Sequence, residues 1–346
     1  MNSEFYSNIV SDGDLSRTAY KDGFDAFIKR LEKEGNSNRE NSMLSDGFAE
    51  RIEEYRSKYI SMLGLDRISD VGLPEPQIKR VGEDEDAVIY KTVIYVTPEI
   101  PQYGILFVPH GVLKAPLVVA QHGGGGTPEL CSDMNGSNSY NHMVRRLLKR
   151  GVAVYAPQLL LWNFDESLPT QPKHDIPYNR DEIDKNLKRF GISLTAVEIK
   201  GIMNSITFLS GLDFIDSECI AMTGLSYGGY FTLHTMAADT RIKAGFSNAC
   251  FNDRNAYPRY DWTYHGSANT FQDAEVAALC APRKLYVAVG KADGVFDYKF
   301  ALAEAERAKR YYESFGCPEN FVFYLWDGGH TVTDSDEGFD FLLSAF

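Results

Sequence analysis

The sequence lacks the basic excess that nucleic acids and anionic membranes require. It has 35 lysines and arginines against 48 aspartates and glutamates, a net charge of −13. Both partners bind through basic patches, so we expect neither. Apolar runs such as Ala115–Ala120 are far too short to span a bilayer. Residues 1–14 show none of the basic, then apolar pattern of a signal peptide, and we expect a cytoplasmic protein.

Metal and cofactor motifs are also missing. The chain has five cysteines and no C-x-x-C or H-E-x-x-H pattern, so we expect neither a disulfide framework nor a metal site. The glycine run Gly123–Gly126 continues into Thr127-Pro128 rather than the Lys-Ser/Thr of a phosphate loop. A Rossmann pattern does not follow the first parallel strand, and we expect no nicotinamide cofactor.

The sequence does contain a regular alternation of short apolar strands and helical segments. After an antiparallel pair (88–96 and 103–108), strands are predicted at 117–121, 152–156, 219–223, 244–247, 285–289 and 321–325. Helices are predicted at 140–150, 181–210, 227–238 and 298–315. This alternation predicts an α/β fold, a mostly parallel sheet with helices on both faces. Ligands of such sheets bind beyond the carboxyl ends of the strands.

Residues 1–85 follow a different pattern and predict an N-terminal helical extension, with the catalytic domain at 86–346. One helix is expected at 19–34, ending at Gly35-Asn36, and a second at 43–63, capped by Gly64. Residues 70–86 are expected to be a linker. The extension can form a lid, make a dimer contact in a homo-oligomer or pack on the core, and the sequence leaves these open.

A strand-to-helix turn at 224–229 carries the pattern G-x-S-x-G-G, with Ser226 at its centre. A serine at such a turn projects its hydroxyl in a strained conformation, and the flanking glycines let strand and helix pass closely. A chance Gly-Ser turn is the alternative. The predicted strand before it and helix after it favour a nucleophile.

A serine nucleophile needs a histidine base and an acid that orients it. His330 follows the last predicted strand, near the chain end, as the order Ser, Asp, His requires. Asp293 comes directly off the strand before it, and Asp297 is its rival. We prefer Asp293, because Asp297 is expected to begin the next helix.

Catalysis also needs N–H donors for the oxyanion. We expect one from Tyr227, the residue after the nucleophile, and the other from Gly123 or Gly124, since this glycine loop follows the first parallel strand.

Together these segments resemble the α/β-hydrolase superfamily, and within it the dienelactone hydrolase and acetyl xylan esterase-like branch. The resemblance covers residues 88–346 and includes the Ala281-Pro282-Arg283 turn. It implies Ser226 as nucleophile, Asp293 as acid and His330 as base. It also implies a serine ester hydrolase, with acetylated sugars as candidate substrates. One departure is Gln158, where the family commonly has an aspartate.

Two aromatic and polar stretches, 162–190 and 251–264, are expected to build the substrate site for a small-molecule or oligosaccharide ester. Candidate contacts are Trp162, Arg180, Arg254 and Trp262. Arginines there can hold a carboxylate or serve structural ion pairs. A serine peptidase of the same fold and a non-catalytic binding protein are the alternative functions.

Overall fold

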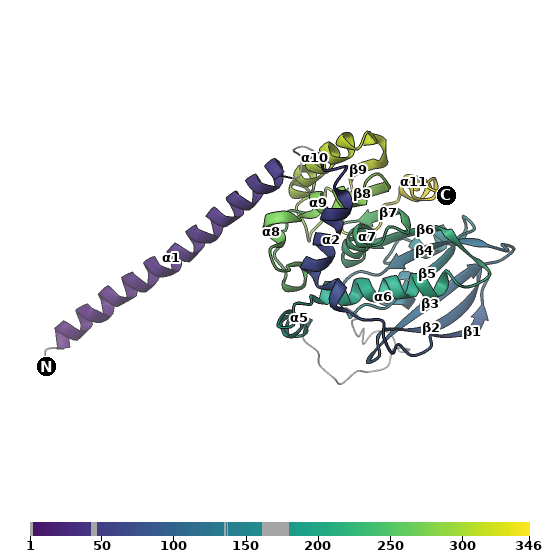
Figure 1. Cartoon of the computed structure of the whole chain (residues 1–346), viewed down its shortest axis with the longest axis horizontal. Helices are drawn as coiled ribbons and strands as arrows, with labels where there is room; N and C mark the ends of the chain where they lie inside the picture. Colours follow the sequence, from purple (N-terminus) through teal and green to yellow (C-terminus); the bar gives the residue numbers. More distant parts are fainter. Residues whose placement is uncertain (1–2, 43–46, 135, 137, 161–179) are drawn as a thin grey trace.

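The protein is built around one large sheet (Figure 1). The computed structural model describes residues 3–42, 47–134, 136, 138–160 and 180–346. Within these residues, nine strands pair in the order β1-β2-β3-β5-β4-β6-β7-β8-β9. Their bounds are β1 Gln77–Glu83, β2 Ala87–Thr97, β3 Ile100–Pro109, β4 Ala115–Gln121, β5 Ala153–Pro157, β6 Ile215–Leu225, β7 Ile242–Asn248, β8 Lys284–Gly290 and β9 Phe321–Trp326.

The strand directions confirm the predicted fold class. Strands β1, β2, β3 and β5 are antiparallel neighbours, whereas β5, β4, β6, β7, β8 and β9 run parallel. The predicted antiparallel pair is β2 and β3. Because β6, β7, β8 and β9 are consecutive and parallel, the loops that follow them meet at one edge of the sheet.

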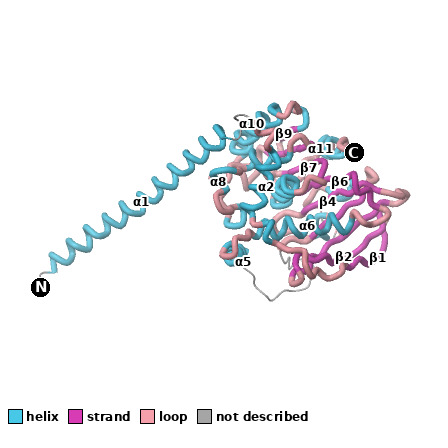
Figure 2. The backbone as a smooth tube through the Cα atoms, in the orientation of Figure 1, coloured by secondary structure: helices cyan, strands magenta, loops and turns pink. Residues whose placement is uncertain are grey.

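Helices cover both faces of the sheet (Figure 2). The larger core contains residues of α2, α6, α7, α9 and α10, and the smaller core contains residues of α3, α4 and α11. The helices are α1 Ser3–Ser42, α2 Ile52–Leu63, α3 Pro128–Cys131, α4 Met143–Leu148, α5 Arg180–Lys188, α6 Leu194–Leu209, α7 Tyr227–Ala238, α8 Ser267–Thr270, α9 Asp273–Cys280, α10 Tyr298–Ser314 and α11 Glu337–Leu343. Along β4, alternate side chains enter opposite cores, as Val118 and Val119 do.

The first helix is longer than predicted. Helix α1 continues through Gly35 and Asn36 to Ser42, because tertiary contacts hold that turn. A Cβ at position 35 would lie 2.8 Å from the Ala268 carbonyl oxygen of α8. Arg39 donates to the same oxygen and lies 3.3 Å from Glu275. Contacts with the rest of the protein, which the local sequence does not reveal, therefore outweigh the helix-ending tendency of Gly-Asn.

Two further segments differ from expectation. Residues 70–86 are not purely a linker, because β1 lies within them and pairs with β2. The two prolines, Pro74 and Pro76, precede the strand and so cost it no ladder hydrogen bond. The single helix expected at 181–210 is two helices, α5 and α6, with Gly191 at a φ of 74° between them.

Helix α2 belongs to the core, which supports the packing interpretation for this part of the extension. Tyr59 and Leu63 are fully buried, and the predicted cap Gly64 adopts a φ of 78°. The Tyr59 hydroxyl lies 2.6 Å from His234 Nδ1 on α7. No helix among the described residues has the length and apolarity needed to cross a membrane.

Candidate active site

Ser226 occupies the sharp turn between β6 and α7. Its backbone has φ 57° and ψ −117°, in the positive-φ region that side chains other than glycine rarely adopt. The Ser226 amide donates to the Asn248 carbonyl of β7 at 2.8 Å, and its carbonyl accepts from Tyr230 at 2.9 Å. Strand and helix thus hold the strained residue at the carboxyl edge of the sheet, as expected for a nucleophile elbow.

The flanking glycines are sterically required. A Cβ on Gly224 would lie 2.4 Å from the carbonyl carbon of Gly228. A Cβ on Gly228 would lie 2.1 Å from the Gln121 carbonyl oxygen of β4. Both contacts are with backbone atoms that cannot turn aside, so the elbow needs glycine at each position.

His330 and Asp293 form a hydrogen-bonded pair at the same edge. His330 Nδ1 lies 2.8 Å from Asp293 Oδ2, and the Asp293 side chain is 1% exposed. Asp293 Oδ1 also accepts from the amides of Val295 at 2.7 Å and Phe296 at 3.0 Å. Burial raises the pKa of the Asp293 carboxyl, but these hydrogen bonds outweigh it and hold the pKa below its usual range.

Two other acids, the rival Asp297 and the loop residue Asp327, have other partners. Asp297 caps α10 by accepting from the Lys299 amide at 3.0 Å, as predicted. Asp327 is 88% exposed and pairs with Lys291. The structure therefore brings Asp293, and neither of these acids, against His330. Among the described residues, the Ser226 hydroxyl makes no hydrogen bond to His330; such bonds often form only when substrate binds.

The glycine loop after β4 lies beside the elbow. A Cβ on Gly123 would lie 3.4 Å from Ser226 Cβ, and one on Gly124 would lie 3.4 Å from the Tyr227 ring. The Gly123 amide donates to the Tyr140 hydroxyl at 2.9 Å, whereas Gly124 is exposed. The Tyr227 amide begins α7 and so has no intrahelical acceptor. The start of α7 and the exposed Gly124 of the glycine loop therefore lie on the same side of the elbow.

His122 fixes the start of this loop. It is fully buried, and its Nε2 accepts from the Leu159 amide at 3.0 Å. Nδ1 therefore carries the proton and donates to the Gly123 carbonyl at 2.9 Å. Burial lowers the pKa of His122 to about 4, which keeps the ring neutral near pH 7.

Two of the arginines considered for substrate contact are held in buried ion pairs. Arg180 contacts Asp261 at 2.8 Å and Glu198 at 3.0 Å. Arg254 pairs with Asp273 through two hydrogen bonds of 2.7 Å. Their main contacts are therefore structural. Trp162 lies outside the described residues.

Arg259 is in a different position, at the exposed rim of the site. Its guanidinium carbon lies 5.7 Å from the Tyr227 ring centroid and 5.2 Å from that of Trp262. It also donates to the Tyr227 hydroxyl at 3.4 Å. In the part of the chain that the structure describes, no carboxylate lies within ion-pair distance of Arg259. Trp262 is 2% exposed and forms the floor beneath this arginine.

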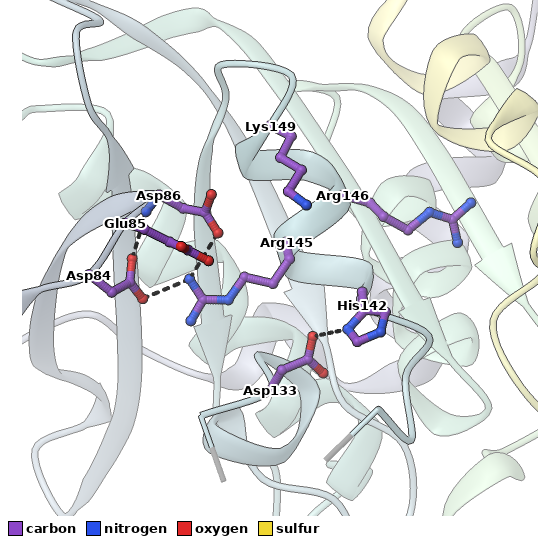
Figure 3. Close-up of a pocket in the computed structure, with 8 residues that line it drawn as sticks. All are labelled: Asp84, Glu85, Asp86, Asp133, His142, Arg145, Arg146 and Lys149. Atoms are coloured by element: carbon purple, nitrogen blue, oxygen red, sulfur yellow. Dashed lines mark hydrogen bonds and ion pairs between the residues drawn. The ribbon is translucent and has the colours of Figure 1, made fainter. Parts of the chain in front are cut away.

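A second histidine–aspartate pair lies elsewhere, in a charged cavity of about 680 Å³ (Figure 3). His142 Nδ1 is 2.8 Å from Asp133, and Arg145 bonds Asp84 at 2.7 Å and Asp86 at 3.3 Å. No serine, threonine or cysteine is among its described lining residues, so the cavity lacks a nucleophile for the pair. Its lining is Asp84, Glu85, Asp86, Asp133, His142, Arg145, Arg146 and Lys149.

The described residues also lack a set of side chains that could bind a metal ion. Across the described ranges, no group of three or more His, Cys, Asp or Glu side chains is arranged to hold a metal ion.

Sequence reasoning missed the residues that support the site from a distance. Tyr140 follows Gly123 by 17 positions, and no motif marks it. Asp261 binds Arg180 and accepts from the Tyr227 hydroxyl at 3.3 Å. Burial and the neighbouring Asp261 carboxylate raise the pKa of Tyr227 to about 12. Such contacts join segments far apart in sequence, and their spacing carries no pattern.

Comparison with known proteins identifies the fold. Residues 192–307 match the model of the prolyl oligopeptidase family. No curated protein matches the sequence. Similar solved structures include acetyl xylan esterase 1 from Thermoanaerobacterium sp. JW/SL YS485, with 14% identity, a TM-score of 0.58 and coverage of 86% of this chain and 94% of that one.

Two other esterases are also similar. A glucuronoyl esterase from Solibacter usitatus has 16% identity and a TM-score of 0.59, over 83% of this chain and 91% of that one. A methylesterase has 17% identity and a TM-score of 0.61, over 87% of this chain and 64% of that one. The chain has the α/β-hydrolase fold, which confirms the expected fold class.

Proposed function

Because the chain has the α/β-hydrolase fold, we propose that it is a serine carboxylic-ester hydrolase that works through an acyl-enzyme. The observation that carries the proposal is the strained Ser226 at the end of β6, with the His330–Asp293 pair after β9 and β8. In this proposal, three parallel strands of one sheet supply the nucleophile, the base and the acid at one edge.

The reaction follows from these roles. His330 Nε2 accepts the Ser226 proton while Oγ attacks the ester carbonyl, and the Tyr227 and Gly124 amides stabilise the oxyanion. As the carbonyl re-forms, the ester C–O bond breaks and His330 protonates the leaving alcohol. A water molecule then gives a proton to His330 and attacks the acyl carbon. The bond between that carbon and Ser226 Oγ breaks, and His330 returns the proton to Oγ, which releases the acid and restores the enzyme.

We propose short acyl esters, such as acetylated sugars, as the substrates. Support comes from the name of a similar structure, which is an acetyl xylan esterase. The aromatic rings of Tyr227 and Trp262, with centroids 4.9 Å apart, are buried and pack against each other beside the elbow. Arg259 lies over both rings and is available to a polar or anionic part of the substrate.

The test is hydrolysis of acetyl, butyryl and longer acyl esters, with acetylated oligosaccharides in the same screen. We expect turnover to fall as the acyl chain lengthens and to be lost in Ser226→Ala. Ser217→Ala is a matched control, because Ser217 is exposed at the other end of β6. A Ser226→Ala enzyme that retains full turnover contradicts the proposed nucleophile.

A serine peptidase is the second candidate, since the matched family segment, 192–307, includes both Ser226 and Asp293. Aminoacyl amides compared with acyl esters of the same size separate the two activities. Amide cleavage at least as efficient as ester cleavage would favour the peptidase. Failure of a fluorophosphonate to label Ser226 in the folded protein would instead favour a binding protein without catalysis.

A further inference from the structure

Helix α1 leaves the rest of the protein as a single long rod (Figures 1 and 2). Its described contacts with other elements lie near its C-terminal end, where Gly35 and Arg39 meet α8 and α9 and Glu40 lies 3.8 Å from Arg310. At 1.5 Å per residue, the part before Gly35 extends about 48 Å. An isolated helix gains little stability in water, and helices in proteins are usually stabilised by packing.

An apolar stripe runs along this protruding part. Each of its large apolar side chains is at least 43% exposed. Most of them fall at alternating intervals of four and three, the spacing of coiled-coil a and d positions. The a and d positions are Tyr6, Val10, Gly13, Arg17, Tyr20, Phe24, Phe27 and Leu31, and Ile9 and Ile28 flank them. Contiguous exposed apolar surface of this kind marks an interaction site.

We propose that this stripe pairs with the same stripe of a second copy, as an antiparallel two-helix coiled coil. The pairing goes beyond the proposed catalytic function and does not depend on it. An antiparallel alignment places a positions of one helix opposite d positions of the other. The resulting layers are Tyr6 with Leu31, Val10 with Phe27, Gly13 with Phe24, and Arg17 with Tyr20, each formed twice.

The two interruptions of the stripe favour this direction. In the antiparallel alignment, Gly13 faces Phe24, so the missing side chain makes room for the ring. Arg17 faces Tyr20, where its guanidinium can lie over the aromatic face. A parallel alignment would instead place Gly13 against Gly13, leaving a void, and Arg17 against Arg17, with like charges opposed.

Flanking charges agree with the same alignment. Asp14 and Lys21 both occupy e positions, and e positions of antiparallel helices face each other. Asp14 of each helix therefore meets Lys21 of the other, which gives two cross-helix pairs. Within one helix these residues already pair with Arg17 and Asp25, so the cross-helix pairs join existing i,i+3 and i,i+4 pairs. A parallel alignment brings Lys21 beside Ser16 and Asp14 beside Ile9, with no opposite charges.

The stripe is large enough for a stable dimer. A fully covered aromatic side chain buries about 150–250 Å². With roughly half of each stripe residue exposed, two copies would bury on the order of 1,500 Å², within the range of about 1,200–2,000 Å² typical of stable interfaces. In this alignment the remaining parts of the two copies attach at opposite ends of the paired helices.

Light scattering after size exclusion tests the pairing on the full chain. We expect a mass of twice 38.8 kDa at micromolar concentrations. Phe24→Glu with Phe27→Glu should give a monomer with unchanged ester turnover. Leu15→Glu is the matched control, because Leu15 is 70% exposed on the same helix but off the stripe, and it should remain dimeric. A monomeric parent, or a dimer that survives the double substitution, overturns the proposal.

Disulfide trapping tests the direction. Val10→Cys and Phe27→Cys are prepared as separate variants, mixed, exchanged and oxidised. The antiparallel layers predict a disulfide between positions 10 and 27 in the mixture and little cross-linking of either variant alone. The parent chain, oxidised under the same conditions, controls for its own cysteines, four of which are buried. Cross-linking within each separate variant would overturn the antiparallel alignment.

Discussion

His330 Nδ1 contacts Asp293 Oδ2 at 2.8 Å, across the loops that follow β9 and β8. Because a carboxylate can only accept, Nδ1 must carry the proton, and Nε2 is left as the acceptor for the proton of Ser226. The two amides that bind the other Asp293 oxygen keep this carboxylate ionised and in place. The pair therefore sets the tautomer that the proposed mechanism needs.

Asp293→Asn tests that role. An amide can donate to Nδ1 and stabilise the wrong tautomer, so we expect kcat to fall by about 10⁴-fold, as in other triads. The control is Asp297→Asn, which alters the cap of α10 but not the contact with His330. It should lose a few tenths of a kcal/mol of stability and keep its kcat. Equal losses of kcat in the two variants would contradict the assignment.

The sequence was sufficient for most of the parallel sheet, because each of its strands is a short apolar run bounded by turns. It also predicted that Asp293, which leaves the strand end directly, rather than Asp297 would lie next to His330, and the two side chains are in contact. It could not predict that α1 continues past Gly35, because the contacts with Ala268 and Glu275 that stabilise this part of the helix are not visible in the local sequence. The sequence likewise could not show that Arg180 and Arg254 form structural ion pairs, because their buried carboxylate partners are distant in sequence.

Tyr140→Phe should impair catalysis without touching the triad. The substitution leaves the buried Gly123 amide without its acceptor, at a cost of about 1–3 kcal/mol. The glycine loop is then free to shift, and we expect kcat/KM to fall about tenfold or more for any ester. Tyr103→Phe is the control, because its hydroxyl donates to Glu129 at 2.6 Å and not to the loop. Unchanged kcat/KM in Tyr140→Phe would exclude a positioning role.

Tyr59→Phe should reduce stability, since α2 is tied to α7 through the 2.6 Å contact with His234. His234 Nε2 has no partner among the described residues, so the variant leaves both ring nitrogens unsatisfied. We expect a loss of about 1–3 kcal/mol in the free energy of unfolding, measured with urea. Tyr260→Phe, at an exposed position, should change it by less than about 0.5 kcal/mol. A stable Tyr59→Phe variant would show that α2 is held by apolar packing.

Arg259→Ala should discriminate between substrates. Arg259 has no carboxylate partner in the described structure, so its guanidinium is available to a carboxylate of the substrate. A charge-assisted hydrogen bond between them would contribute about 1.5–3 kcal/mol to binding. For esters that carry a carboxylate near the acyl bond, we expect KM to rise about tenfold or more. For neutral esters of equal size, the rise should be no more than about threefold. Equal effects on both series would assign Arg259 to packing over Trp262.

The buried His122 should make stability depend on pH. Its native pKa, about 4, lies below the ordinary value of 6.5. Between these two pH values His122 is protonated in the unfolded chain but neutral in the native protein. The free energy of unfolding therefore falls as the pH decreases. The contribution is fully present above pH 6.5 and is lost by about pH 4, a change of roughly 3 kcal/mol.

His122→Gln, which cannot titrate, should be less stable at pH 7 and show a shallower decline between these limits. His265→Gln, at an exposed position, should keep the parent slope. If urea unfolding gives His122→Gln the parent slope as well, then the ring takes up its proton without leaving the Gly123 carbonyl, and the loop does not require a neutral histidine.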